Sequence, residues 1–227
     1  MASEGSGRGG RREAILQAAL RRFTRYGYRR TSMDEIAREA DVSRAALYLH
    51  FDNKEALFRE LSESVHEQIL AGAEAAASSE GTVDARLFRV LEAKLVRFYE
   101  LLKSSEHGEE LIDENNRLGG EISTRSKQRF RQLLARILRR ADAAGEIALD
   151  AAGLKPDRAA DLVLSAAMGI EAAAEDLTPA LYRRQLAQML RVLVAGLGGA
   201  GETKRQPTRA GSARMVAAKG RAGTAAS

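Results

Sequence analysis

The sequence has 227 residues but no cysteine, no tryptophan and only three prolines. Without cysteine, the chain forms neither disulfides nor thiolate catalytic or metal sites. Because proline is scarce, few positions interrupt a helix, and the abundant alanine, leucine and arginine all favour helix. No window alternates β-branched or aromatic residues with polar ones at the two-residue period of a strand. We therefore predict an all-α fold.

Long apolar runs are also missing from the sequence. None approaches the roughly 18 residues that a membrane-spanning helix needs. The amino terminus carries basic residues but lacks the apolar core of a secretory signal. The expectation is a cytoplasmic protein that makes no contact with a membrane.

The sequence patterns typical of enzymes are incomplete. Glu63 and His66 form one E-x-x-H pair, whereas a di-iron helical bundle needs two such pairs. Gly5, Gly7 and Gly10 match G-x-G-x-x-G, but no strand precedes them, which argues against a dinucleotide site. Neither a P-loop nor a nucleophile elbow is present. We predict no enzymatic activity, no cofactor and no metal site.

Charge is distributed unevenly along the chain. Residues 1–54 hold 11 Lys and Arg against 7 Asp and Glu, residues 55–198 hold 19 against 23, and residues 199–227 hold 6 against 1. Basic chain ends are typical of a protein that binds a polyanion, although a random distribution of surface charge produces a similar asymmetry along the chain. Residues 1–9 and 199–227 are rich in small residues and lack apolar periodicity, so we expect both to be disordered. The basic tail either adds non-specific affinity for nucleic acid or only improves solubility.

Apolar periodicity predicts the first helix near the amino terminus. Ile15, Ala19 and Phe23 recur at spacings of four, which places them on one face of a helix over residues 11–26. Gly27 then ends this helix, because glycine readily adopts the left-handed conformation of a helix C-terminus.

Two short helices with a tight turn between them are predicted next. Ser32 and Glu35 form a capping box that begins the second helix, and Asp41 tolerates the left-handed backbone of the turn. Ser43 caps the third helix. Two helices joined in this way over residues 32–51 form a helix-turn-helix unit, or else an ordinary helical hairpin within a bundle.

The residues of this segment closely resemble the TetR family of bacterial regulators. The resemblance covers roughly residues 10–70, which implies a three-helix DNA-binding domain there. Asp41 and Ala45 depart from the family pattern, since glycine is common at the first position and frequent at the second. A Cβ atom at position 45 limits close approach to the DNA groove. Four residue pairs carry the most specific part of the resemblance: Val42-Ser43, Leu47-Tyr48, His50-Phe51 and Lys54-Glu55.

The second helix of a helix-turn-helix unit enters the major groove of DNA with its amino-terminal end first. Arg44 is the long donor at that end, so we expect it to read a guanine, with a phosphate contact as the alternative. The methyl groups of Ala45 and Ala46 are placed to touch thymine methyls. The resemblance implies that Tyr48 and His50 contact phosphates, although both also suit packing at the domain surface.

Further phosphate contacts are expected from hydroxyl groups and cations near the helix starts. Such contacts position a protein on DNA without specifying the sequence. The candidates are Arg11, Thr31, Ser32, Ser43 and Lys54.

Residues 71–198 show the pattern of longer amphipathic helices, which predicts a helical ligand-binding and dimerisation domain. The expected helices cover 83–103, 122–144, 156–176 and 179–197, with a polar interval over 104–116. The resemblance implies that the last two helices pair with their copies in a second subunit. The alternative is that they only close the core of the monomer.

The middle helices of this domain are expected to enclose an apolar pocket for a small molecule. The candidate lining residues are Phe98, Tyr99, His107, Glu110, Asn115 and Met168. Phenylalanine and methionine at helical spacing equally fit a plain core, and Glu110 fits a solvated acidic face.

Two functions remain open from the sequence. The first is a homodimeric, ligand-responsive repressor that binds a palindromic double-stranded DNA operator, associates with the nucleoid when bound, and is released by an unknown small molecule. The second is a structural DNA-binding protein of the same fold without a ligand. A closed apolar cavity favours the first, and a filled core favours the second.

Overall fold

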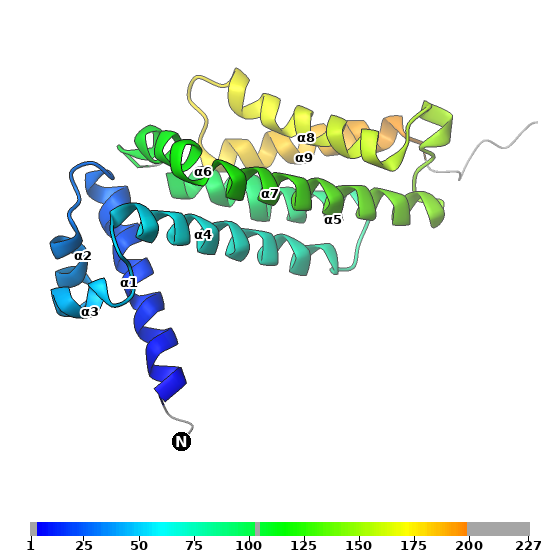
Figure 1. Ribbon diagram of the computed structural model, residues 1–227. Helices are drawn as coiled ribbons and strands as arrows, with labels where there is room; N and C mark the ends of the chain where they lie inside the picture. Colours follow the sequence, from blue (N-terminus) through cyan, green and yellow to red (C-terminus); the bar gives the residue numbers. More distant parts are fainter. Residues whose placement is uncertain (1–3, 103–104, 199–227) are drawn as a thin grey trace, which may run out of the picture.

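The computed structural model describes residues 4–102 and 105–198, with side chains from residue 10 onward. Every regular element in these residues is helical, which confirms the all-α prediction (Figure 1). The elements are α1 (Glu4–Tyr26), α2 (Met33–Glu39), α3 (Arg44–Tyr48), α4 (Lys54–Ala77), α5 (Val83–Leu91), the π-helical turn η1 (Glu92–Val96), α6 (Arg97–Leu102), α7 (Gly108–Ala143), the 3-10 turn η2 (Asp150–Ala152), α8 (Pro156–Ala173) and α9 (Pro179–Gly196).

The helices form an elongated body with α1, α2 and α3 at one end (Figure 1). The long helices α4 and α7 pack against each other, and α8 and α9 form a further layer on the side away from α4. None of the helices in the described residues is both long and apolar enough to span a membrane.

The predicted caps of the amino-terminal helices are confirmed. The Ser32 hydroxyl accepts a hydrogen bond from the Glu35 backbone N–H, and the Glu35 carboxylate accepts one from the Ser32 N–H at 2.8 Å. Asp41 has φ +52, and Ser43 Oγ accepts from the Ala46 N–H at 3.1 Å. These local hydrogen bonds fix where α2 and α3 begin and how closely they approach each other.

The first helix is longer than predicted. It begins at Glu4 rather than at residue 11, so the expected disorder is wrong for residues 4–9. Once a helix is nucleated, each further residue adds one backbone hydrogen bond, and a glycine costs only about 1 kcal/mol relative to alanine. The predictions for residues 1–3 and for the tail over 199–227 lie outside the described residues.

Two predictions for residues 83–116 also differ from the structure. The helix expected over 83–103 is divided by η1, which places Lys94 and Val96 in the interior and leaves Leu95 only partly buried. The interval over 104–116, predicted to be a polar stretch between two helices, is helical from Gly108 onward. Helix α7 bends at Gly119, whose φ of −124 and ψ of 22 are not helical.

The buried apolar residues form two clusters. One lies among α1, α2, α3 and the start of α4, and it also takes in Leu102, Leu111 and Leu118 from α6 and α7. The other joins α4, α5, α7, α8 and α9 around Phe130 and Tyr182. The amino-terminal helices therefore pack directly on the beginning of α7. A movement of α6 or α7 would change their contacts with the cluster that holds α1.

Candidate DNA-binding surface and effector region

Helix α3 presents one face to the core and the other to solvent. Leu47 and Phe51 are buried at 0% and 3% exposure and hold the helix against α1 and α4. Tyr48 is 40% exposed on the opposite side. The remaining predicted contacts of this helix are exposed or partly exposed: Ser43, Arg44, Ala45, Ala46 and His50. The helix-turn-helix unit thus holds a short helix with a free outer face.

Leu49 belongs to this outer face but is absent from the sequence prediction. It is 86% exposed, an unusual position for a leucine. The sequence spacing does indicate that Leu49 is exposed. Leu47 and Phe51 are four residues apart on the buried face, and Leu49 lies between them. An apolar side chain here is placed to contact a thymine methyl or a sugar.

Arg44 is paired within the protein but remains available. Its guanidinium donates to Asp34 Oδ2 at 2.7 Å and lies 5.5 Å from the centre of the Tyr48 ring. The side chains of both ion-pair partners are largely exposed, at 66% and 49%. Such a pair is worth less than about 1 kcal/mol, so a base or phosphate can displace Asp34 at little cost.

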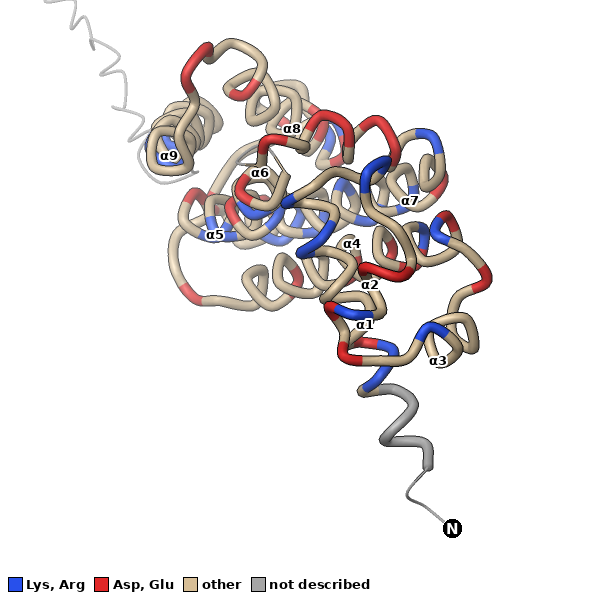
Figure 2. The backbone as a smooth tube through the Cα atoms, turned by 90° about the vertical axis from the view of Figure 1, so that its left-hand side faces the viewer, with Lys and Arg blue, Asp and Glu red and all other residues tan. Residues whose placement is uncertain are grey.

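The end of the molecule formed by α1, α2 and α3 carries charges of both signs. Figure 2 shows Lys and Arg interspersed with Asp and Glu along these helices. Arg11 is exposed, whereas its neighbour Arg12 bonds the Glu60 carboxylate and lies 4.7 Å from the Phe51 ring centre. Arg12 therefore joins α1 to α4, and Arg11 remains the candidate for DNA.

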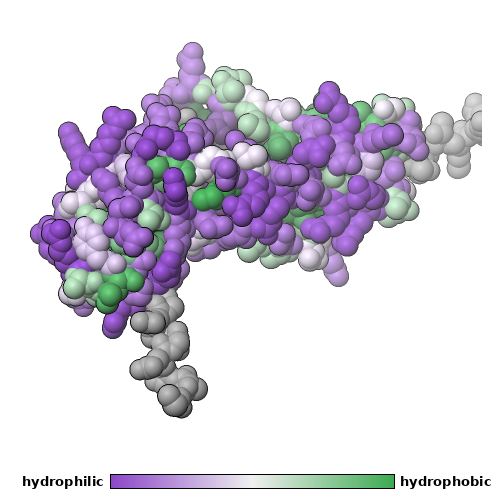
Figure 3. All heavy atoms as spheres, viewed as in Figure 1, coloured by the Kyte–Doolittle hydropathy of each residue, from purple (hydrophilic) through white to green (hydrophobic). Residues whose placement is uncertain are grey.

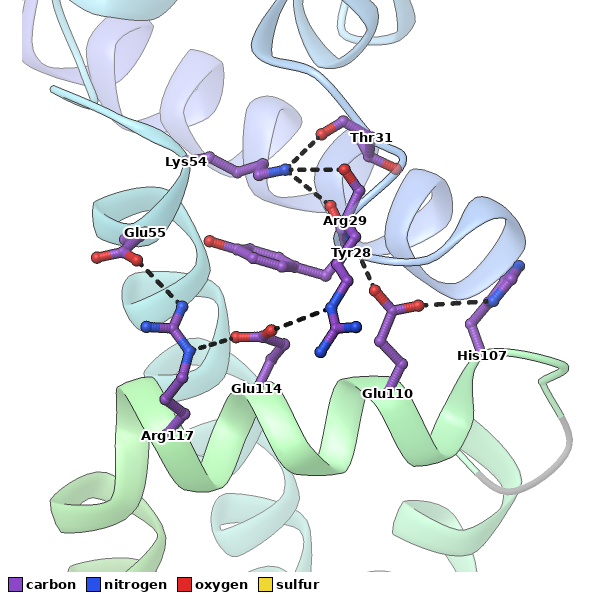
Figure 4. A network of polar contacts seen from close by, with 9 residues as sticks. All are labelled: Tyr28, Arg29, Thr31, Lys54, Glu55, His107, Glu110, Glu114 and Arg117. Carbon is purple, nitrogen blue, oxygen red and sulfur yellow. Dashed lines mark hydrogen bonds and ion pairs between the residues drawn. The ribbon is translucent and has the colours of Figure 1, made fainter.

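Thr31 and Lys54 face the interior rather than a phosphate. The Thr31 side chain is buried, and its hydroxyl donates to the Gly27 carbonyl at 2.7 Å. The Lys54 ammonium donates to the carbonyls of Tyr28 and Thr31, both at 2.9 Å (Figure 4). Partial burial lowers the pKa of Lys54. Both residues hold the turn between α1 and α2, a role that the sequence does not reveal.

We expect Lys54→Met to lower the free energy of unfolding by about 1–3 kcal/mol, because carbonyls of the turn lose their donor. Urea unfolding measures this change. Lys155→Met, which removes an exposed lysine at the start of α8, is the matched control and should have little effect. Unchanged stability together with a smaller salt dependence of DNA binding would instead assign the ammonium to a phosphate.

His107 and Glu110, predicted to line a pocket, lie instead where α7 meets the turn between α1 and α2 (Figure 4). Glu110 Oε1 accepts from the Arg29 backbone N–H at 2.8 Å, and Glu110 Oε2 lies 3.7 Å from His107 Nδ1. Gly27 lies directly against this carboxylate. A Cβ atom at position 27 would lie 2.4 Å from Glu110 Oε2. These contacts connect the DNA-binding end to α7.

Glu114 continues this network one turn along α7. It is buried at 7% exposure and pairs with Arg117 at 2.8 Å, while Arg117 also reaches Glu55 of α4 at 3.0 Å (Figure 4). Hydrogen bonds to Glu114 and Glu55 raise the pKa of Arg117. Glu110 and Glu114, near the start of α7, therefore form internal contacts.

The other predicted pocket residues are divided by the fold. Phe98 and Asn115 line a small cavity, whereas Tyr99 bonds the Leu177 carbonyl and packs edge-to-face on Tyr182. Met168 is 51% exposed on the outer surface of α8. Of the six predicted pocket residues, only Phe98 and Asn115 therefore line this cavity.

The small cavity lies between α1, α4, α6 and α7 and has a volume of about 50 Å³. Its walls are mainly leucine and phenylalanine, with Ser62, His66 and Asn115 as polar groups. An open groove of about 760 Å³ adjoins it, and Leu20, Val65 and Leu101 line both spaces. The groove carries Arg89, Arg97, Arg183, Glu92 and Glu100.

These features define an all-helical protein with an exposed helix-turn-helix unit and a small cavity behind it. Residues 15–61 match the family described as bacterial regulatory proteins, tetR family. The resemblance to the TetR family is thus confirmed over this amino-terminal region.

Curated relatives match over the same region. The chain is 45% identical over 56 residues to the transcriptional regulator TtgR of Pseudomonas putida, covering 25% of this chain and 27% of the relative. It is 36% identical over 70 residues to the probable acrEF/envCD operon repressor of Escherichia coli, covering 28% and 32%. The alignments thus span about a third of these relatives or less.

Solved structures match over most of the chain. A TetR-family regulator of Mesorhizobium loti covers 84% of this chain and 98% of its own, with a TM-score of 0.67 and 23% identity. The regulator FadR of Bacillus subtilis, solved with stearoyl-CoA, covers 82% and 99%, with a TM-score of 0.57 and 22% identity. At these identities the likeness shows that the fold is shared.

Proposed function

We propose that this protein is a homodimeric transcription regulator that binds an operator in double-stranded DNA and is released by a small molecule. The observation that carries the proposal is the exposed face of α3, formed by Arg44, Ala45, Tyr48 and Leu49, on a helix-turn-helix scaffold. Buried Leu47 and the Ser43 cap hold this face in place. One such helix supplies few base contacts, so specific binding needs two copies.

Helices α8 and α9 are the proposed dimer interface. Their outer surface exposes apolar side chains that nothing in the described monomer covers: Leu162, Met168 and Val192, at 42%, 51% and 73%. Figure 3 shows hydrophobic atoms along the edge of the molecule over α8. Gly169 has open space around it, so a partner helix can approach closely. Pairing of α8 and α9 with their copies would bury these groups.

Three observations support a small-molecule effector. The cavity beside Phe98 is apolar with few polar groups, as ligand sites are. It adjoins an open groove, and Leu20 of α1 lines both spaces. The relatives with this fold include one solved with stearoyl-CoA. A ligand that displaces Leu20 would act directly on the helix that supports the DNA-binding surface.

The test is selection of binding sites from random double-stranded DNA with the full chain. We expect a palindromic consensus with half-sites about 10 base pairs apart, since two recognition helices meet successive major grooves about 34–36 Å apart. Failure to enrich any sequence would reject the proposed function.

We expect Arg44→Ala to remove the preference at one position in each half-site, at a cost of about 1–3 kcal/mol in discrimination. Arg38→Ala is the matched control, because Arg38 is exposed on α2 rather than on α3. The control should weaken binding at most uniformly across sequences. An unchanged consensus for Arg44→Ala would assign Arg44 to a phosphate.

A further inference from the structure

Lys94 is a buried cation without an anionic partner. It is 8% exposed and lies on η1, between α5 and α6. Its ammonium donates to Ser126 Oγ at 3.1 Å and lies 5.4 Å from the Phe130 ring centre. No ion pair among the described residues includes it. A buried charge is normally paired with an opposite charge. The described residues around Lys94 supply no such negative charge.

One face of α7 connects Lys94 with the cavity, because Ser126, which bonds Lys94, recurs with Ser123 and Gly119 at spacings of three and four residues. Ser126 and Ser123 of α7 and Ser62 and His66 of α4 are each less than 9% exposed. Gly119 lies beside these groups, because a Cβ atom there would meet both Ser62 Oγ and Asn115 Oδ1 at 3.2 Å. We call this set of groups, which ends at Lys94, the α4–α7 polar seam.

Two helix irregularities border the seam. The π-helical turn η1 places Lys94 in the interior, and α7 is kinked at Gly119. A π-helical turn is often found at a functional site, because it sacrifices regular hydrogen bonds to aim a side chain. Without η1, the regular stripe of the helix would have kept an apolar residue in place of the lysine.

His66 connects the seam with the cavity. It lines the cavity and stacks on Phe98, with ring centroids 6.0 Å apart. Its Nδ1 atom is buried and has no hydrogen-bond partner. Burial and the charges of Lys94 and Lys127 lower the pKa of His66 to about 4, and burial and Lys127 lower that of Lys94 to about 8. A bound anion would stabilise the protonated, positively charged form of each side chain.

We infer that the effector is a carboxylate with an apolar body, whose charge pairs with Lys94 and bonds His66 while its body lies among the phenylalanines of the cavity. The inference rests on the proposed function for its regulatory meaning, but the binding itself does not depend on DNA. The cavity of about 50 Å³ is smaller than the roughly 300 Å³ of small ligand pockets. Binding therefore displaces Leu20, Val65 and Leu101 and joins the cavity to the groove.

The experiment is calorimetric titration of the full chain at pH 7 with octanoate and with 1-octanol, which share an apolar body and differ in charge. We expect octanoate to bind at least tenfold more tightly than 1-octanol. Lys94→Met should remove at least tenfold of the octanoate affinity and leave that for 1-octanol within about twofold. The variant should fold, because it replaces an unpaired buried cation by an apolar side chain of similar length.

Arg97→Met is the matched control, since Arg97 lies in the outer groove and its side chain is 70% exposed. It should keep the preference for octanoate. Equal affinities for the two probes, no binding of octanoate, or loss of the preference in Arg97→Met with retention in Lys94→Met would each overturn the inference. Operator binding, measured separately, would still report on the proposed function, so the two can fail independently.

Discussion

Gly27→Ala is expected to lower the free energy of unfolding by about 2–3 kcal/mol. Gly27 has φ +83, and a residue with a Cβ atom in the left-handed region costs roughly 1–2 kcal/mol. The added Cβ atom would also lie 2.4 Å from Glu110 Oε2. The glutamate must then move and lose its hydrogen bond with the Arg29 N–H, worth about 1 kcal/mol. Urea unfolding of the full chain measures the sum.

Gly145→Ala separates the two causes. Gly145 has φ +73, but nothing lies within 4 Å of a Cβ atom built there. It should therefore show the backbone cost alone, about 1 kcal/mol less than Gly27→Ala. In a Glu110→Ala background, the cost of Gly27→Ala should fall close to that of Gly145→Ala, with only the 3.2 Å contact to His107 Nδ1 remaining. Equal costs for the two glycines in the parent chain would show that the carboxylate moves freely.

The protein is expected to become more stable as the pH rises from 8 to 9.5. The pKa of Lys94 is 10.5 in an unfolded chain and about 8 in the folded protein. Between these values the unfolded chain binds more protons, so raising the pH favours the folded state. At about 1.36 kcal/mol per pKa unit, the complete effect is about 3 kcal/mol, of which roughly half falls within this range.

The measurement is urea unfolding at pH 7, 8, 9 and 9.5 with Lys94→Met as the control. The variant lacks the titrating group and should give a flatter curve. Other titratable groups that act on Lys94 or on its neighbour His66, namely Lys127 of α7 and Glu67 of α4, remain in both proteins. Tyr182, whose burial raises its pKa to about 12, has the opposite effect only above this range. Parallel curves would mean that Lys94 is hydrated in the folded state.

The helix-turn-helix unit could be predicted from sequence because its signals are local. A cap depends on residues three positions apart, as in Ser32 with Glu35, and a left-handed turn depends on one residue, Asp41. The outer face of α3 follows from the same periodicity, so the exposed Leu49 was within reach of the prediction.

The effector region could not be predicted in the same way. His107 and Glu110 were expected in a pocket because they are polar residues in a helical domain. In the structure they lie against the turn between α1 and α2 that contains Gly27. A regular helix over 83–103 would place Leu91 and Leu95 inward and would leave Lys94 off the buried face. The π-helical turn changes which residues of this helix face the core, and no local sequence pattern predicts the turn.

The sequence by itself determined the all-helical class, the beginnings of α2 and α3, and the side of α3 that faces solvent. These depend on hydrogen bonds and apolar spacing within a few residues. Only the tertiary structure decided which polar residues are buried, among them Lys94, His66 and Glu114. Burial of a polar group depends on partners from distant segments, and the cost of a missing partner becomes visible only when those segments pack together.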